Sequence, residues 1–225
     1  MEIDNSKIVD LRRMVTAAQQ EFDMAVTFHE VWKPAAYDQD LHSRLGKSYA
    51  TQAFLITRTA LRREMLLALI RLWDSNTKAI RMRCIAATVG EKEVIAALAL
   101  DRVNHLGWPE DFDEMRNDLK KRATEVGLIV EKYMKGGARH AVFKKLLALR
   151  HERLAHRQLI PATATGANAT DEEIEDFYQD NAKLIQILLG VVNAMAYDPQ
   201  DTAKVYRLYA SHFWGTFRKT GNESR

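Results

Sequence analysis

Apolar residues recur at helical spacing along most of the chain. In residues 47–73 the leucines that share one face of a helix with a period of about 3.6 residues are Leu55, Leu61, Leu66, Leu69 and Leu72. The same spacing, interrupted by only 4 prolines and 10 glycines, divides the sequence into segments. The pattern predicts helices at about 4–31, 47–73, 74–88, 91–104, 110–134, 138–159, 170–196 and 202–216.

Residues that start or stop helices lie at several of these boundaries. Pro34 is expected to close the first helix, and Gly136 and Gly137 to end the helix that begins near residue 110. Thr170 and Glu173 have the spacing of a capping box for the helix that follows. Asp74, Ser75 and Asn76 are candidate caps for the short helix that runs to about Thr88.

The fold class follows from the absence of strand patterns. No segment alternates convincingly with a period of two, and the nearest, "VGLIV" at 126–130, lies inside a helical pattern. The small-residue stretch "PATATGANAT" at 161–170 predicts a loop. We therefore expect an all-α protein, a multi-helix bundle that forms one domain over residues 1–225 with 161–170 as an internal loop.

Composition narrows the function classes only a little. The 33 basic and 30 acidic residues give a formal net charge of +3, which is compatible with a nucleic-acid partner but does not argue for one. No apolar run approaches the roughly 18 residues of a membrane span, and the N-terminal "MEIDNSKIVD" is too polar for a secretory signal. The single cysteine, Cys84, fits a reducing compartment. We expect a cytoplasmic protein with no membrane partner.

The stretch "RHERLAHR" at 150–157 concentrates the candidate chemistry. A zinc helix places two histidines four residues apart, on one face. His151 and His156 are five apart, which separates them by about 140° around a helix axis. Cys84 has no second thiol with which to form a metal-binding pair. The sequence therefore argues against a metal site.

Arg150 lies at an unusual position in the predicted helix. At about 100° per residue, it falls in the middle of the apolar stripe that contains Phe143, Leu146, Leu147 and Leu154. By the same count Lys145, Ala148 and Glu152 mark the outer, solvated face, and Arg157 continues the apolar stripe. A guanidinium at a core-facing position costs free energy unless a partner compensates it.

Three interpretations of Arg150 remain open at this point. It forms a buried ion pair, with Asp74 or Glu64 as partner; or the stripe faces the same helix of a second copy; or the stripe forms a site for a phosphate ester. A guanidinium offers a fork of donors that suits phosphate oxygens, and histidine transfers protons near neutral pH. The second and third interpretations are compatible.

These residues resemble the signature of the HEPN superfamily, in which an arginine and a polar residue precede a histidine by a few positions. Here the signature is Arg150, His151, four further residues and His156. The phrase "LRHERLAHRQL" resembles the AbiU-type abortive-infection branch more closely. "LIRLWD" at 69–74 and the Glu-x-Trp phrase at 30–32 are similar to two further phrases of that branch, in the same order along the chain.

The resemblance implies a metal-independent endoribonuclease without a cofactor, which acts on RNA as a homodimer with a composite cleft. In that class the 2′-hydroxyl of the RNA attacks the adjacent phosphodiester. By resemblance His156 is the general acid and base, Arg150 stabilises the charge on phosphorus and His151 orients the pair. Three residues are expected to support them: Arg153, Arg157 and Asp74. Of these, Asp74 would hold Arg150 in place.

The resemblance also leaves an alternative from another class. Many HEPN domains are non-catalytic, so this chain could instead be a helical nucleotide-binding or protein-interaction module. An antitoxin or regulatory protein is an expected partner in either case. One toxin class carries a tyrosine two residues beyond the histidine, which its antitoxin modifies; here that position is Gln158, which argues against such control.

A second group of cations lies between residues 58 and 83. It comprises Arg58, Arg62, Arg63, Arg71, Arg81 and Arg83. These residues are either an RNA-binding surface or an ordinary charged helix face, and the second interpretation is favoured.

Overall fold

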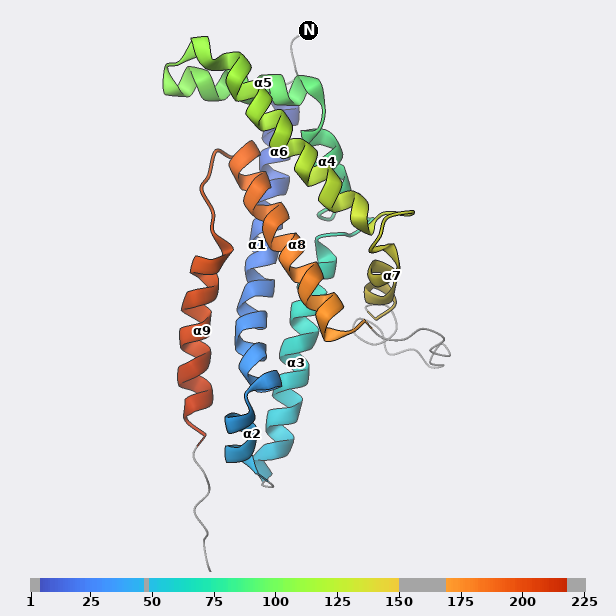
Figure 1. The fold of residues 1–225 in the computed structure, drawn as a ribbon, viewed down its shortest axis with the longest axis vertical. Coiled ribbons are helices and arrows are strands. Elements are labelled where there is room, and N and C mark those ends of the chain that lie inside the picture. The colour runs from blue at the N-terminus through green and yellow to red at the C-terminus, as the bar shows by residue number, and fades with distance from the viewer. Residues whose placement is uncertain (1–4, 47–48, 150–168, 218–225) are drawn as a thin grey trace, which may run out of the picture. The chain divides into compact units, whose positions relative to one another are not determined.

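A computed structural model describes residues 5–46, 49–149 and 169–217. Within these ranges the chain forms nine α-helices, α1–α9, one short 3-10 helix and no strand (Figure 1). An isolated bridge joins Trp73 and Arg81. The prediction of an all-α, multi-helix fold is confirmed.

The helices divide between two compact units, which share α1 (Asn5–Tyr37) and α3 (Tyr49–Arg71). Unit 1 comprises residues 1–22 and 69–197, and unit 2 comprises residues 23–68 and 198–225. The prediction that residues 1–225 form one domain, with 161–170 as its internal loop, stays a prediction.

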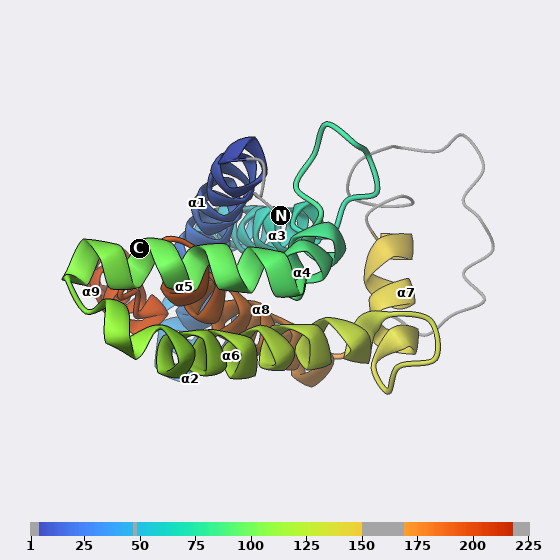
Figure 2. The ribbon, with the colours of Figure 1, turned by 90° about the horizontal axis from the view of Figure 1, so that it is seen from above.

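Unit 1 is built around α6, which packs against the four other α-helices that lie wholly within the unit. Besides the start of α1, its helices are α4 (Met82–Val89), α5 (Lys92–Leu106), α6 (Phe112–Tyr133), α7 (His140–Leu149) and α8 (Asp171–Val192). Gly107, with φ of 75°, ends α5, and the 3-10 helix Pro109–Asp111 leads into α6. As a result α5 and α6 lie side by side (Figure 2).

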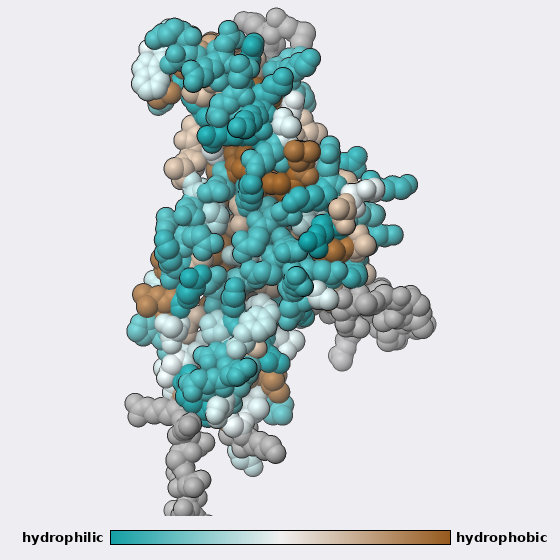
Figure 3. All heavy atoms as spheres, viewed as in Figure 1, coloured by the Kyte–Doolittle hydropathy of each residue, from teal (hydrophilic) through white to brown (hydrophobic). Residues whose placement is uncertain are grey.

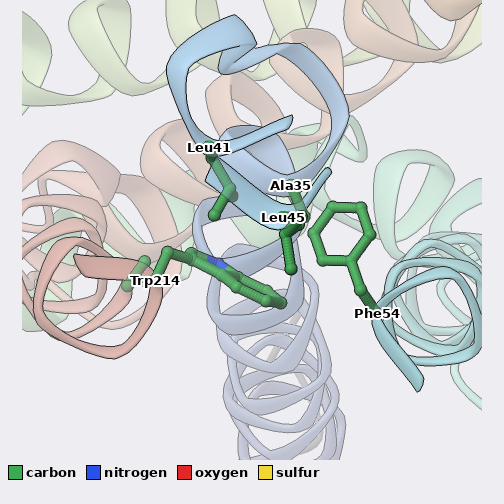
Figure 4. Close-up of a cluster of buried hydrophobic side chains, with 6 residues drawn as sticks. Ala35, Leu41, Leu45, Phe54 and Trp214 are labelled. Atoms are coloured by element: carbon green, nitrogen blue, oxygen red, sulfur yellow. The ribbon is translucent and has the colours of Figure 1, made fainter. Parts of the chain in front are cut away.

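Unit 2 has its own apolar cluster. Its helices are the second half of α1, α2 (Gln39–Leu45), most of α3 and α9 (Pro199–Gly215). The side chains that meet in its centre are Ala35, Leu41, Leu45, Phe54 and Trp214 (Figure 4). The Trp214 indole N–H donates to Val31 O at 2.9 Å, so the ring is fixed as well as buried.

The first helix boundary was predicted wrongly. Pro34 does not close α1, which continues to Tyr37. An internal proline removes one backbone hydrogen bond and costs about 3 kcal/mol. Ala35, in the next position, is fully buried in the unit 2 cluster, so tertiary packing favours the continued helix. The short helix α2, which Asp38 caps through the N–H groups of Asp40 and Leu41, was not predicted.

Two other helix starts also differ from the prediction. Helix α4 begins at Met82, because Asp74 and Asn76 accept from the backbone of their own turns and not from a helix. Helix α9 begins at Pro199, where Asp198 accepts from Gln200 N at 2.9 Å. The capping box of Thr170 and Glu173 at the start of α8 is confirmed.

Hydrophilic side chains cover most of the face seen in Figure 3, with hydrophobic ones in small patches. Over the described ranges no helix combines the length and the apolar character that a membrane crossing requires.

Candidate functional site

Most of the predicted site residues lie outside the part of the chain that the structure describes. These are Arg150, His151, Arg153, His156 and Arg157. Their roles therefore stay predictions. The structure does describe Asp74, the helix α7 that leads into the signature, and the start of α8 that follows it.

Helix α7 confirms the apolar stripe as far as Leu149. Val142, Phe143 and Leu146 are buried, Leu147 is partly buried and Ala148 is exposed. This is the stripe in which the helical spacing predicts Arg150, immediately after the last residue of α7.

Lys145 was predicted on the outer face, and this prediction is wrong. Its side chain is only 30% exposed, and its ammonium group lies 2.8 Å from Glu173 on α8. The hydrogen bond from Lys145 and a second one from Thr170 N keep the pKa of Glu173 below its ordinary value. The same carboxylate therefore caps α8 and links its first turn to α7.

Two further charged contacts connect α8 to the end of α6 and the turn before α7. Arg139 donates to Asp176 at 2.6 Å. Asp180 accepts from Lys132 at 2.9 Å and from the Tyr133 hydroxyl at 2.8 Å. Burial and the hydrogen bond to Asp180 both raise the pKa of Tyr133, so its hydroxyl remains protonated and a donor. These contacts fix the helices on both sides of residues 150–168.

An aromatic cluster lies beneath these contacts. Trp73 contacts Tyr133, Phe143 and Phe177, with ring centroids 5.4–5.7 Å from its own. The indole N–H donates to the fully buried Asn181 at 2.8 Å, and Asn181 donates back to Phe177 O. Asn181 was not identified from the sequence. The signal that singled out Arg150, a polar residue within an apolar stripe, was also present at Asn181.

Asp74 follows Trp73 directly and is partly buried. Its carboxylate accepts from Asn76 N at 3.0 Å, an arrangement that shapes the turn after α3. Because Trp73 packs against Phe143 of α7, the backbone of Asp74 lies near the helix that leads to Arg150. The supporting role predicted for Asp74 and its contact with Arg150 both stay predictions.

The Glu-x-Trp phrase lies in the interior of unit 2. Glu30 is 4% exposed and Trp32 5% exposed. Glu30 Oε1 lies 3.1 Å from His29 Nδ1, and Oε2 accepts from Arg207 at 3.0 Å. Burial raises the pKa of Glu30, but the hydrogen bonds and positive charge of His29 and Arg207 outweigh it, so the pKa is lowered overall. The phrase therefore has a structural role.

Four of the six arginines between residues 58 and 83 have side-chain contacts with neighbouring residues. Arg71 pairs with Glu21 at 2.7 Å, and Arg63 lies 3.7 Å from Glu64. Arg58 and Arg62 lie over the rings of Phe54 and Trp32. These contacts favour the charged helix face over a dedicated RNA surface. Among the described residues, no group of three or more His, Cys, Asp or Glu side chains is arranged to hold a metal ion.

The helical architecture and the comparison with protein families define a HEPN-type protein. The model of the AbiU2 family of HEPN domains matches residues 8–213, and the chain belongs to this family. Comparisons with curated proteins and with solved structures gave no significant match.

Proposed function

We propose that the protein is a metal-independent endoribonuclease of the abortive-infection type, which cleaves RNA in a composite cleft of a homodimer. The observation that carries this proposal is the AbiU2 match, because the matched residues 8–213 include the complete signature, Arg150, His151 and His156.

The helices next to the signature support the proposal. Catalytic groups need supports that hold them within a fraction of an ångström of the productive geometry. The Lys145–Glu173 pair links α7 to the start of α8. The ring contact between Trp73 and Phe143 links α7 to the chain segment that continues into Asp74. The signature is thus flanked by helices that are packed and hydrogen-bonded to each other.

The proposed reaction needs no external nucleophile. The 2′-hydroxyl oxygen of the RNA forms a bond to the adjacent phosphorus, and the bond from phosphorus to the 5′-oxygen breaks. His156 serves as the general base that accepts the 2′-hydroxyl proton and as the acid that protonates the leaving oxygen. Arg150 stabilises the negative charge on the phosphoryl oxygens. The products are a cyclic 2′,3′-phosphate and a 5′-hydroxyl.

The spacing of the two residues favours a dimer. Arg150 and His156 are six positions apart, which on a helix is about 9 Å along the axis and about 120° around it. A single helix can hardly bring both side chains to one phosphate, whereas two antiparallel copies can. Asp74 would then hold Arg150 in orientation.

The direct test is incubation of the purified protein with end-labelled RNA in EDTA. We expect cleavage with cyclic phosphate ends, and a loss of at least about a hundredfold in His156→Ala, the lower end of the usual contribution of general acid–base catalysis. His212→Ala is the matched control, since His212 is exposed near the end of α9. Absence of cleavage, or cleavage that survives in His156→Ala, would contradict the assignment.

The same variants address the non-catalytic alternative. If the protein is a helical interaction module, Arg150→Ala should lower thermal stability or dimerisation, and neither the native protein nor the variant should cleave RNA. In cells, expression of an active ribonuclease should slow growth, and the Arg150→Ala, His156→Ala double variant should restore it.

A further inference from the structure

A cavity of about 820 Å³ in unit 1 contains a cluster of cations that the proposed catalytic site does not use. It is bounded by α1, α5, α6 and the C-terminal end of α8. The charged and titratable side chains in its wall are Arg12, Asp101, Arg102, His105 and Arg122. Three guanidinium groups and an imidazole thus face one carboxylate.

Arg102 is the most constrained of the three arginines. Its Nη2 donates to Gly190 O at 2.7 Å and to Val191 O at 3.1 Å, two carbonyls of the last turn of α8. Burial lowers the pKa of Arg102, and the nearby Arg122 and Arg12 cations lower it further, although Asp118 and Asp101 offset part of this effect. Since an arginine is charged well above neutral pH, the group remains a cation under repulsion from its neighbours.

Arg122 approaches the same turn of α8. A Cβ atom on Gly190 would lie 3.6 Å from Arg122 Nη1. Glycine inside a helix costs about 1 kcal/mol relative to alanine, and here it leaves the side of the helix open where two guanidinium groups converge. Arg122 uses Nε for its pair with Asp118 at 2.9 Å, so its Nη groups retain donor capacity.

Arg12 completes the cluster from α1. Its Nε donates to Val192 O at 3.3 Å and its Nη2 to Asp101 at 2.6 Å. Asp101 and Asp118 pair with Arg12 and Arg122, so two carboxylates stand against three guanidinium groups. The hydrogen bonds of Arg102 described above go to carbonyl oxygens, and the two carboxylates compensate its charge from a greater distance.

An uncompensated acceptor lies in the same wall. Asn193 Oδ1 is buried and has no hydrogen-bond partner among the described residues, although its amide nitrogen donates to Thr16 at 3.0 Å. A buried acceptor without a donor costs free energy, and this oxygen has almost no accessible surface through which a ligand in the cavity could contact it.

We propose that this cavity is a binding site for a phosphate ester. The guanidinium groups of Arg102 and Arg122 receive the phosphate oxygens, the geometry for which arginine is best suited. The ligand is either a free sugar phosphate or the backbone of RNA, since both carry this chemistry. The site depends on none of the signature residues and stands whether or not the protein cleaves RNA.

The test is calorimetric titration of the full-length protein, at fixed ionic strength, with ribose 5-phosphate in one arm and a short RNA oligonucleotide in the other. We expect binding in at least one arm and an affinity about tenfold lower in Arg122→Gln, because a charge-assisted hydrogen bond is lost. Arg122→Lys keeps the charge without the fork, and is expected to fall between the two.

Arg116→Gln provides a matched control. Arg116 is also on α6, is also about half exposed and also pairs with a nearby aspartate, Asp113 at 3.0 Å, but it lines a different cavity. Its affinity should stay within about twofold of the native protein. Binding only of ribose 5-phosphate identifies a free ligand, and binding of RNA that Arg122→Gln weakens, measured in the Arg150→Ala, His156→Ala background, identifies the backbone.

The proposal is overturned if neither probe binds, or if Arg122→Gln and Arg116→Gln change the affinity equally. The Arg150→Ala, His156→Ala double variant should retain binding of ribose 5-phosphate at native affinity. Failure of the ribonuclease proposal would therefore leave this result unaffected.

Discussion

Glu30 and Asn181 are polar residues placed where the helix pattern calls for apolar ones. Each is almost completely buried, and each is satisfied by partners from distant parts of the sequence. Burying such a group without partners would cost about 1–3 kcal/mol, and more for a charge. Their positions mark points at which the local fold is specified by hydrogen bonds in addition to apolar packing.

Glu30 makes the stability of the protein depend on pH. Its pKa in the folded protein lies below the ordinary value of 4.5. A carboxylate with a lowered pKa stabilises the fold above its unfolded pKa, and the contribution is lost as the pH falls through the folded value. Glu30→Gln should therefore lower the free energy of unfolding by about 1–3 kcal/mol at pH 7 and flatten its decline below pH 4.5.

Urea titrations between pH 7 and pH 3 would measure this effect. Glu114→Gln, a change of the same chemistry at an exposed position in the first turn of α6, removes only a favourable interaction with the helix dipole and should change the free energy of unfolding by less than about 1 kcal/mol. An equal decline at low pH in Glu30→Gln and the native protein would show that the ion contributes nothing.

Asn181 and Lys145 show the limit of sequence reasoning at this scale. A helix wheel identifies a polar residue in an apolar stripe, but it does not show which neighbour supplies the partner. The partner of Asn181 is Trp73, which is 108 positions away in the sequence. The partner of Lys145 is Glu173, and this ion pair leaves the lysine side chain only partly exposed. Only Asp74, among the predicted site residues, could be compared with the structure.

At the scale of the helices, periodicity and caps predicted most elements but not their exact ends. The capping box of α8 was found because both of its residues are local in sequence. The continuation of α1 through Pro34 was not, because the burial of Ala35 that favours it is tertiary. The start of α4 was placed too early, since Asp74 and Asn76 have the same residue types as helix caps.

The turn from α6 to α7 contains two glycines, Gly136 with φ of 91° and Gly137, which has no room for a side chain. A Cβ atom on Gly137 would lie 2.1 Å from Glu131 O and 2.5 Å from Lys132 O, so the backbone itself would have to move. We expect Gly137→Ala to lower the free energy of unfolding by at least about 2 kcal/mol. It should also displace α7 and lower any RNA cleavage by the signature that follows.

Gly127→Ala is the control for this change. Gly127 lies inside α6, and a Cβ atom there would have no heavy atom within 4 Å. Alanine is the better helix former, so this variant should gain about 0.5–1 kcal/mol. Thermal and urea unfolding of the two variants should thus move in opposite directions, and a shift in the same direction would refute the assignment of Gly137 as a sterically required position.

For the whole molecule, the fold class was the most predictable property. The repeated helical spacing and the lack of strand patterns were enough for an all-α protein, and the family match agrees with the resemblance found in short phrases. The oligomeric state is harder to predict than the fold class, because a single sequence does not show which surface a second copy would contact. The proposal of a homodimer therefore rests on the spacing of Arg150 and His156.

That spacing leads to a test of the composite cleft. If each site takes its arginine from one copy and its histidine from the other, homodimers of Arg150→Ala and homodimers of His156→Ala are both inactive. After subunit exchange, half of the dimers should be mixed, and each mixed dimer should hold one intact pairing of the two present in the native dimer. The mixture should therefore recover roughly a quarter of the native cleavage rate. If the two residues of one chain acted together, mixing would restore nothing, because no chain in the mixture carries both. Cleavage assays on co-expressed, differently tagged variants, with the double variant mixed with native protein as the reference, separate these two outcomes.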